Sequence, residues 1–195
     1  MSGILDILSG AIGNDTVEKI GSQLGIDSGT TSTIVNAALP LLLSALAKNS
    51  SSQQGAEALH NAVTKDHDGS ILDNIGGLLG GAVNGNGGGI LGHILGNKRD
   101  QIQQGLGAST GVDGSTVGSV LELLAPVVMG AIGRQTASQG LDAGGLAGML
   151  KGAAQGANKS SPDLMGSLLG MLDTNKDGNV VDDVAGMLGK LFNKS

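Results

Sequence analysis

Two segments of this chain repeat each other, and the repeat constrains the fold more than any other feature. Residues 26–48 realign on residues 112–134 at a constant offset, and the alignment places Pro40 on Pro126. Because matching sequences encode matching local structure, we expect two copies of one supersecondary unit. The two copies should superpose, with the two prolines at equivalent positions.

A second stretch of the repeat shows where the copies differ in length. Residues 66–74 realign on residues 175–183, so the second copy contains an insertion of about one helix near residues 150–171. The sequence therefore predicts a single domain built of two repeats. Its parts are repeat one (residues 1–80), a glycine-rich linker (81–89) and repeat two with an extra helix (90–195).

Composition indicates an all-α fold with a core of small side chains. The chain has 36 Gly and one Phe, with no Trp, Tyr or Cys, so Leu, Ile, Val, Ala and Met must form the core. Burial of these side chains contributes roughly 25 cal/mol per Å². No segment alternates apolar and polar residues for long enough to form a strand. A net charge of −6 with scattered Lys and Arg argues against a nucleic-acid partner, which requires a basic face.

Two long apolar helices should form the centre of the molecule and contact each other. The first is expected to start at a cap provided by Asp27 or Ser28 and to reach about Leu46. Proline removes a backbone hydrogen bond inside a helix, so Pro40 and Pro126 predict a bend in each long helix. The sequence thus predicts an internally duplicated helical bundle with two Pro-kinked central helices.

Shorter helices should surround this pair. Apolar residues recur at helical spacing over residues 4–12, and Asp15–Glu18 has the pattern of a capping box that opens the next helix. The remaining expected helices cover residues 53–63, 71–79, 141–153, 164–172 and 180–192.

Several runs of sequence resemble one known family. These runs are His67–Asp73, Ile90–Gly96, Leu124–Gly130 and Asp173–Asp183. They are similar to the YidB-like family of bacterial proteins of unknown function (domain of unknown function 937). The resemblance covers most of the chain and implies a small bacterial helical protein. It brings no established activity, substrate or catalytic residue.

The loop near the C-terminus resembles the first half of an EF-hand. Calcium requires six to eight oxygen ligands, and a D-x-N-x-D-G turn places three oxygen-bearing side chains on one side of a tight loop. Val184 stands where the bidentate acid of an EF-hand belongs, so Asp183 must serve in its place. Alternatively, these acids stabilise the N-terminus of the helix that follows. The candidate calcium ligands are Asp173, Asn175, Asp177, Asn179 and Asp183.

The corresponding first-copy loop is a weaker metal site. It keeps Asp66, Asp68 and Asp73, but Thr64 replaces the first acid and His67 interrupts the motif. We expect a degenerate twin that holds the helix junction by hydrogen bonds.

The histidines and one serine motif are also weak signals. His60, His67 and His93 lack the spacing and the cysteine partners of a zinc site. We expect His93 to be half-buried and hydrogen-bonded. His67 should be a surface residue or support nearby ligands, and a transition-metal site of His67 with Asp66 and Asp68 is a less favoured alternative. Gly107–Gly111 matches the G-x-S-x-G motif around Ser109, but it lacks the strand-to-helix context of a hydrolase, and we interpret it as a loop.

Three classes of function follow. The favoured class is a non-enzymatic structural or interaction protein that binds calcium weakly and contacts a protein partner or itself. The second is a secreted or membrane-active helper, because the glycine-rich, acidic, cysteine-free composition resembles that of harpins. Its apolar helices nevertheless lack the Lys/Arg face of interfacial helices, so a membrane surface is a less favoured partner. The third and least favoured class is a serine hydrolase.

The sequence predicts a cytoplasmic location by default. The first residues carry no basic region, and Asp6 and Asp15 interrupt the apolar stretch expected of a signal peptide. The apolar runs at 37–47 and 121–132 are shorter than the roughly 20 residues of a membrane span, which favours buried helices. Export without a cleaved signal stays open.

Overall fold

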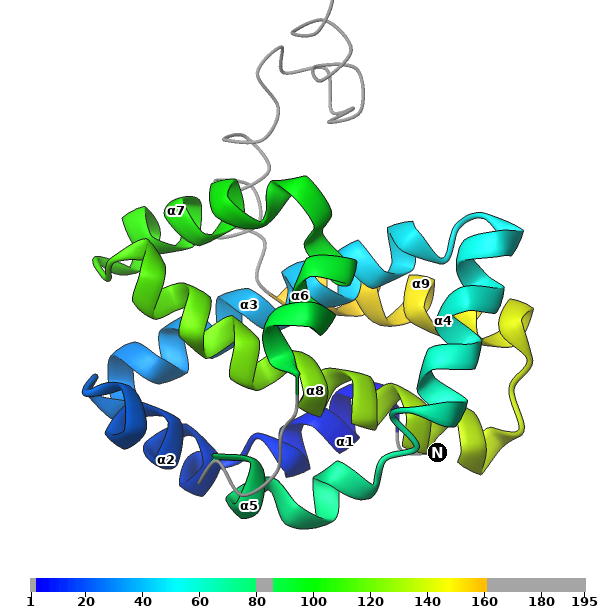
Figure 1. Ribbon diagram of the computed structural model, residues 1–195, viewed down its shortest axis with the longest axis horizontal. Helices are drawn as coiled ribbons and strands as arrows, with labels where there is room; N and C mark the ends of the chain where they lie inside the picture. The colour runs from blue at the N-terminus through cyan, green and yellow to red at the C-terminus, as the bar shows by residue number, and fades with distance from the viewer. Residues whose placement is uncertain (1–2, 80–85, 161–195) are drawn as a thin grey trace, which may run out of the picture. The chain divides into compact units, whose positions relative to one another are not determined.

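A computed structural model describes residues 3–79 and 86–160, which belong to one compact unit spanning residues 1–160. These residues form helices and connecting turns, with no strand among them, which confirms the all-α class. Residues 161–195 lie outside the described part, so a single domain over the whole chain stays a prediction. The elements, shown in Figure 1, are α1 (Ile4–Ala11), α2 (Asn14–Leu24), α3 (Ser28–Asn49), α4 (Gln53–Lys65), η1 (Ser70–Asn74), α5 (Ile75–Leu79), α6 (Gly87–Leu95), η2 (Gly96–Lys98), α7 (Arg99–Thr110), α8 (Gly114–Gln139) and α9 (Ala143–Ser160).

The long helices α3 and α8 pack against each other, as expected for a shared core. Their apolar side chains are buried almost completely: Leu42, Leu121 and Leu124 expose none of their surface. Pro40 and Pro126 both lie inside continuous helices. Whether the two prolines bend their helices equally stays a prediction.

Both long helices begin with the same capping arrangement. The Asp27 carboxylate accepts a hydrogen bond from the Thr30 backbone N–H at 2.9 Å, and Asp113 accepts one from Thr116 N–H at 2.9 Å. Each bond satisfies one of the backbone donors that a helix leaves unpaired in its first turn. These hydrogen bonds and that of Ser115 keep the pKa of the Asp113 carboxyl far below its ordinary value, and that of Asp27 is lowered by Thr30.

The corners that lead into the long helices also correspond. Gly25 and Gly111 end the preceding helices α2 and α7 with φ of 70° and 74°, the left-handed region that glycine favours. One turn earlier, a Cβ on Gly21 or Gly107 would lie 2.7 or 2.6 Å from a carbonyl oxygen of the following loop. Both corners therefore depend on glycine at the same two places.

The shorter helices cover this central pair in a reciprocal pattern. Helix α2 packs on α3 and also contacts α8, while α7 packs on α8 and also contacts α3. Helix α1 contacts α8, and α6 contacts both long helices. The helix after α3, α4, packs on α8, whereas the helix after α8, α9, packs on α3 and on α4. The elements from each half of the sequence thus build one core together.

Several local expectations were wrong. Helix α2 is capped at Gly13 without a side-chain hydrogen bond, so the capping box at Asp15–Glu18 does not form. The helix expected over 71–79 is a short 3-10 helix followed by α5, and helix α6 begins at Gly87, inside the segment assigned to the linker.

The helices α3 and α8 are each long and apolar enough to cross a membrane, since they have 22 and 26 residues. The apolar runs at 37–47 and 121–132 belong to these two helices, and the expectation that neither crosses a membrane stays a prediction. Within the described unit, however, 78 % of the most apolar window of α8 is buried. Core helices of soluble proteins have the same length and composition, so this finding is weak evidence for a membrane.

Candidate functional site: an apolar groove between α4 and α6

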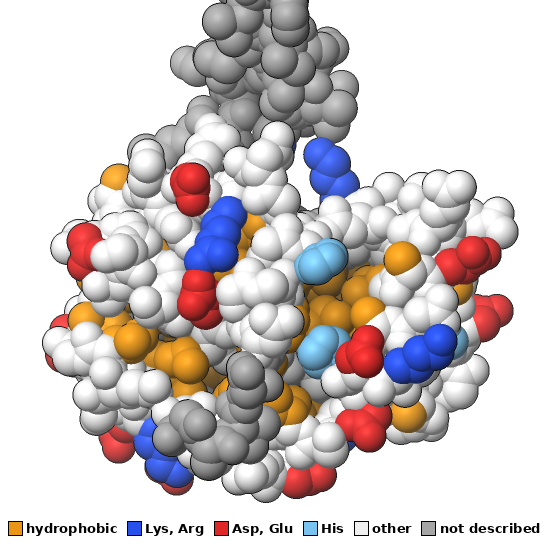
Figure 2. Space-filling view, in the orientation of Figure 1, with side chains coloured by type: hydrophobic (Ala, Val, Ile, Leu, Met, Phe, Trp, Pro, Cys, Tyr) orange, Lys and Arg blue, Asp and Glu red, His pale blue; other side chains and the backbone are white. Residues whose placement is uncertain are grey.

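A groove of about 1000 Å³ opens between α4 and α6. Figure 2 shows it as a hollow with hydrophobic side chains at its base and two histidine side chains beside it. The polar rim includes Asn49, Asp66, His67, Asp68 and His93. The larger apolar side chains that line it are Leu46 from α3, Leu59 from α4, Ile71 from η1, Ile90 and Ile94 from α6, and Met129 from α8.

The loop after α4 forms one wall because two glycines of α8 let it approach closely. A Cβ on Gly133 would lie 1.8 Å from the carbonyl oxygen of His67 and 2.9 Å from that of Val63. A Cβ on Gly130 would lie 2.5 Å from the Ile71 side chain. Real Cβ atoms are not found at such distances, so the position of this wall requires glycine on α8.

Arg134 fixes the same loop from the next position of α8. Its guanidinium donates to the Gly69 carbonyl at 2.9 Å and to the Asp73 carboxylate at 2.7 Å. Gly69 has a φ of 98°, a left-handed conformation that makes the sharp turn between α4 and η1. Asp68 completes the turn by accepting a hydrogen bond from the Ser70 N–H at 3.0 Å. This loop therefore holds the helix junction by hydrogen bonds, as the sequence predicted.

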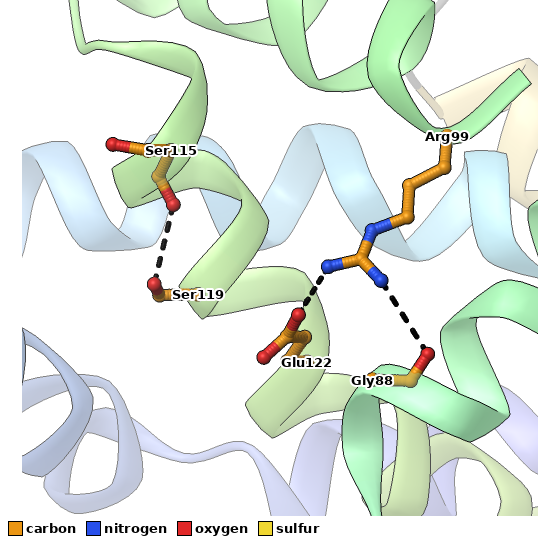
Figure 3. A network of polar contacts seen from close by, with 5 residues as sticks. All are labelled: Gly88, Arg99, Ser115, Ser119 and Glu122. Atoms are coloured by element: carbon orange, nitrogen blue, oxygen red, sulfur yellow. Dashed lines mark hydrogen bonds and ion pairs between the residues drawn. The ribbon is translucent and has the colours of Figure 1, made fainter.

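The N-terminal end of α6 is anchored to α8 on the other side of the groove. Arg99 forms an ion pair with Glu122 of α8 and also donates to the Gly88 carbonyl at 3.5 Å (Figure 3). A Cβ on Gly87 would lie 1.9 Å from the Glu122 carbonyl oxygen, so α6 meets α8 at backbone distance. Glycines thus set the distance between α8 and both walls.

The C-terminal end of α6 is joined to α3. The Asn49 side-chain amide donates to the carbonyls of Ile94 at 2.9 Å and His93 at 3.3 Å. These carbonyls belong to the last turn of α6, where helical acceptors are left unpaired. Asn49 therefore stabilises the end of α6 and closes one end of the groove.

Burial and charge act in opposite directions on His67. Desolvation lowers the pKa of its imidazole, while the nearby Asp66 carboxylate raises it, and the net shift is downward. The Asp68 carboxyl has a lowered pKa because it accepts hydrogen bonds from Ser70 and lies near Arg134. At neutral pH the rim therefore carries the negative charge of Asp68 beside a neutral His67.

The other two histidines each place a ring nitrogen within hydrogen-bonding distance of a backbone carbonyl. The His93 Nδ1 lies 2.8 Å from the Gly89 carbonyl, which confirms that the ring is hydrogen-bonded. The expectation that His93 is half-buried was wrong, because it is exposed at the groove rim. The His60 Nε2 lies 2.9 Å from the Leu141 carbonyl and links α4 to the loop between α8 and α9.

The predicted calcium ligands cannot be placed in this site. Asp173, Asn175, Asp177, Asn179 and Asp183 lie outside the described residues. Over residues 3–79 and 86–160, no group of three or more His, Asp or Glu side chains is positioned to hold a metal ion.

Ser109 lies in a helix rather than in the loop expected for its motif. Helix α7 continues to Thr110, and the Ser109 hydroxyl donates to the Leu106 carbonyl at 2.9 Å. A nucleophile elbow requires a sharp strand-to-helix turn, which this position does not form.

Sequence reasoning missed the groove. The sequence pattern places Asp66 and Asp68 in a weak metal loop, and Ile90 and Ile94 in a run that resembles a known family. Neither pattern predicts a groove. The available signal was the pair of glycines on one face of α8. The two glycines predict a close approach only when it is known that the loop after α4 crosses α8 at this point.

Comparison with known proteins gives one match. The family model for bacterial proteins of unknown function called DUF937 matches residues 6–135, from α1 through most of α8. No curated protein and no solved structure matches the chain. The matched span includes every residue that lines the groove, from Leu46 to Met129. Since this match extends over more than half of the sequence, the chain belongs to the DUF937 family of bacterial proteins of unknown function.

Proposed function

We propose that this DUF937 chain is a non-enzymatic interaction protein whose duplicated helical scaffold presents the α4–α6 groove to an apolar ligand or segment. The observation that carries the proposal is the groove itself, with an apolar floor contributed by five elements and polar groups at its rim. Concave, mostly apolar sites with a few polar groups are typical binding sites.

The equivalent corners support the proposal that the scaffold arose by duplication. The caps at Asp27 and Asp113 use the same atoms, and Gly21 and Gly107 make the same close approach. A duplicated core can stay constant while its peripheral segments diverge. The groove lies among those peripheral segments.

A dye that binds apolar sites tests the groove. Nile red, which is uncharged, should become fluorescent with the native protein. Ala58 lines the groove, is exposed and lies on α4, so Ala58→Lys should obstruct binding without disturbing the core. Ala108→Lys is the matched control, because Ala108 is exposed on α7 and does not line the groove. Equal dye binding by the two variants would refute the groove as the site.

Weak calcium binding by the C-terminal loop stays part of the proposal. The D-x-N-x-D-G pattern at Asp173, Asn175 and Asp177 supports it. A ligand at a hundredfold excess over Kd stabilises the native state by about 2.7 kcal/mol. Millimolar calcium should therefore raise the melting temperature measured by circular dichroism. Asp177→Ala should abolish that rise, while Asp68→Ala should preserve it.

A membrane-active protein is the second candidate. The lengths and hydropathy of α3 and α8 favour it, although much of both helices is buried in the described unit. Co-sedimentation with anionic and neutral lipid vesicles tests it. Protein that stays in the supernatant with both vesicle types at low salt would exclude this function.

A further inference from the structure

We propose that the α4–α6 groove receives a basic amphipathic helix of a partner protein, a proposal that rests on the proposed function. Such a helix would place its apolar face on Leu59, Ile90 and Met129 and its Lys or Arg side chains beside Asp66 and Asp68. Shape and charge support this occupant independently.

The shape of the groove suits a helix. It lies between two helices, α4 and α6, with the loop after α4 extending one wall, and Figure 2 shows that its apolar base opens onto the surface. A volume of about 1000 Å³ is at the upper end of the range for small-molecule pockets. In helix-in-groove recognition, apolar anchors at i, i+3, i+4 and i+7 insert into a site of this kind.

The floor can adapt to the apolar face of a helix. Met129 comes from α8, which is held to both walls, and its unbranched thioether side chain adjusts its shape easily. Ile71, Leu59 and Ile90 are supplied by three different elements around it. Together these side chains can accept several anchor residues rather than one fixed group.

Charge selects a basic partner. Asp66 and Asp68 line the groove, while no Lys or Arg is among the described residues that line it. Arg134, whose charge acts on Asp68, donates its hydrogen bonds to Gly69 and Asp73. Lys65 precedes Asp66 but does not line the groove. The ionisable carboxylates at this rim therefore favour a cationic partner.

Peptide titration of the full-length protein tests the partner class. Three synthetic peptides of about five helical turns share one length. The first has Leu at i, i+3, i+4 and i+7 with Lys on both flanks, the second has Glu in place of Lys, and the third is a scrambled Lys peptide. Each carries a fluorescent label, and binding is followed by anisotropy at low and high salt.

Two pairs of variants locate the binding and its charge dependence. Asp66→Asn with Asp68→Asn should weaken the Lys peptide about five- to tenfold, since two partly exposed ion pairs are lost. Asn at position 68 can still accept the Ser70 N–H bond, so the turn is preserved. Asp15→Asn with Asp100→Asn removes the same charge on α2 and α7, outside the groove, and should leave affinity unchanged. Ala58→Lys should weaken binding, whereas Ala108→Lys should not.

The outcomes separate the partner class from the proposed function. Tighter binding of the Lys peptide than of both others, weakened by added salt and by the groove variants alone, would support the proposal. Equal binding of the Lys and Glu peptides, or equal losses in the control variants, would overturn it. Nile red binding without any peptide binding would overturn the helix partner and leave an apolar small-molecule site. Failure of both probes would refute the proposed function as well.

Discussion

The first halves of α3 and α8 are alike, but their last turns differ, and the groove lies where they differ. Both helices start at an aspartate cap and follow a glycine corner with the same close approach. Near their ends, the alignment that pairs Pro40 with Pro126 also pairs Ala47 with Gly133. Only α8 has glycine there, and the loop after α4 uses it to approach within backbone distance.

Under the proposed duplication and groove function, this difference separates the parts of the repeat that would serve folding from those that would serve binding. The corners and caps position the two long helices, and a change in either copy would disturb the common core. The end of α8 instead accommodates the loop that contributes His67, Asp68 and Ile71 to the groove. One substitution can therefore give one copy a surface feature that the other does not have.

Gly133→Ala should have the largest effect on stability. The added Cβ would lie 1.8 Å from the His67 carbonyl oxygen, so the loop or α8 must shift. Overpacking against two backbone carbonyls should cost about 3 kcal/mol. For a chain of this size that lowers the melting temperature by roughly 6–12 °C, measurable by circular dichroism.

Gly148→Ala is the matched control for that loss. Gly148 lies in α9, and a Cβ there would meet nothing within 4 Å. Alanine is preferred to glycine inside a helix by up to about 1 kcal/mol, so this variant should be neutral or stabilised. If Gly133→Ala behaved in the same way, the glycine contact would not set the position of the loop.

Gly21→Ala and Gly107→Ala should cost similar amounts, although a Cβ on Gly21 would also lie 2.8 Å from the Thr31 hydroxyl oxygen, the end of a side chain. The new Cβ would lie 2.7 Å from a loop carbonyl oxygen in the first copy and 2.6 Å in the second. We expect a loss of about 2 kcal/mol for each variant, which urea unfolding monitored by circular dichroism can compare. A large loss in one copy and none in the other would show that the two corners are not energetically equivalent.

The helical core was predictable because its signals are local. Apolar spacing and the repeat predicted α3 and α8, and Asp27 caps α3 as one of the two named candidates, whereas the matching cap at Asp113 was not named in advance. The groove was not predictable, because its walls depend on contacts between distant residues. Arg134 binds Asp73 across 61 positions of sequence, and no local pattern pairs them. The exposure of His93 likewise depends on how α6 is seated on α3 and α8.

Arg134→Met should have a smaller effect on stability and a clear effect on the loop. The Arg134–Asp73 pair is partly exposed, with 40 % and 72 % of the two side chains accessible, so its loss should cost at most about 1 kcal/mol. Methionine keeps the apolar stem but cannot donate to the Gly69 carbonyl. Amide hydrogen exchange over residues 67–73 should become faster, while exchange in the first turns of α8 stays constant. Unchanged exchange in the loop would mean that the glycine contacts alone hold it.

Protonation of His67 should have the smallest effect, and it distinguishes the groove loop from the caps by pH. Its pKa is below the ordinary value of about 6.5, because burial of the imidazole outweighs the Asp66 charge. The unfolded chain then binds the proton more readily, so the stability contributed by neutral His67 is present above about pH 6.5 and is lost as pH falls towards the folded-state pKa. Asp27, Asp68 and Asp113 also have lowered pKa values, so their contribution to stability is likewise lost as pH falls. That loss occurs in a lower pH range, below about 4. Urea midpoints between pH 3 and 8 should therefore decline in two windows, and His67→Gln should flatten the upper one while preserving the lower one. A His67→Gln profile identical to that of the native protein would show that the half-buried imidazole contributes nothing to the pH dependence, and that the acid sensitivity arises from the caps and turns alone.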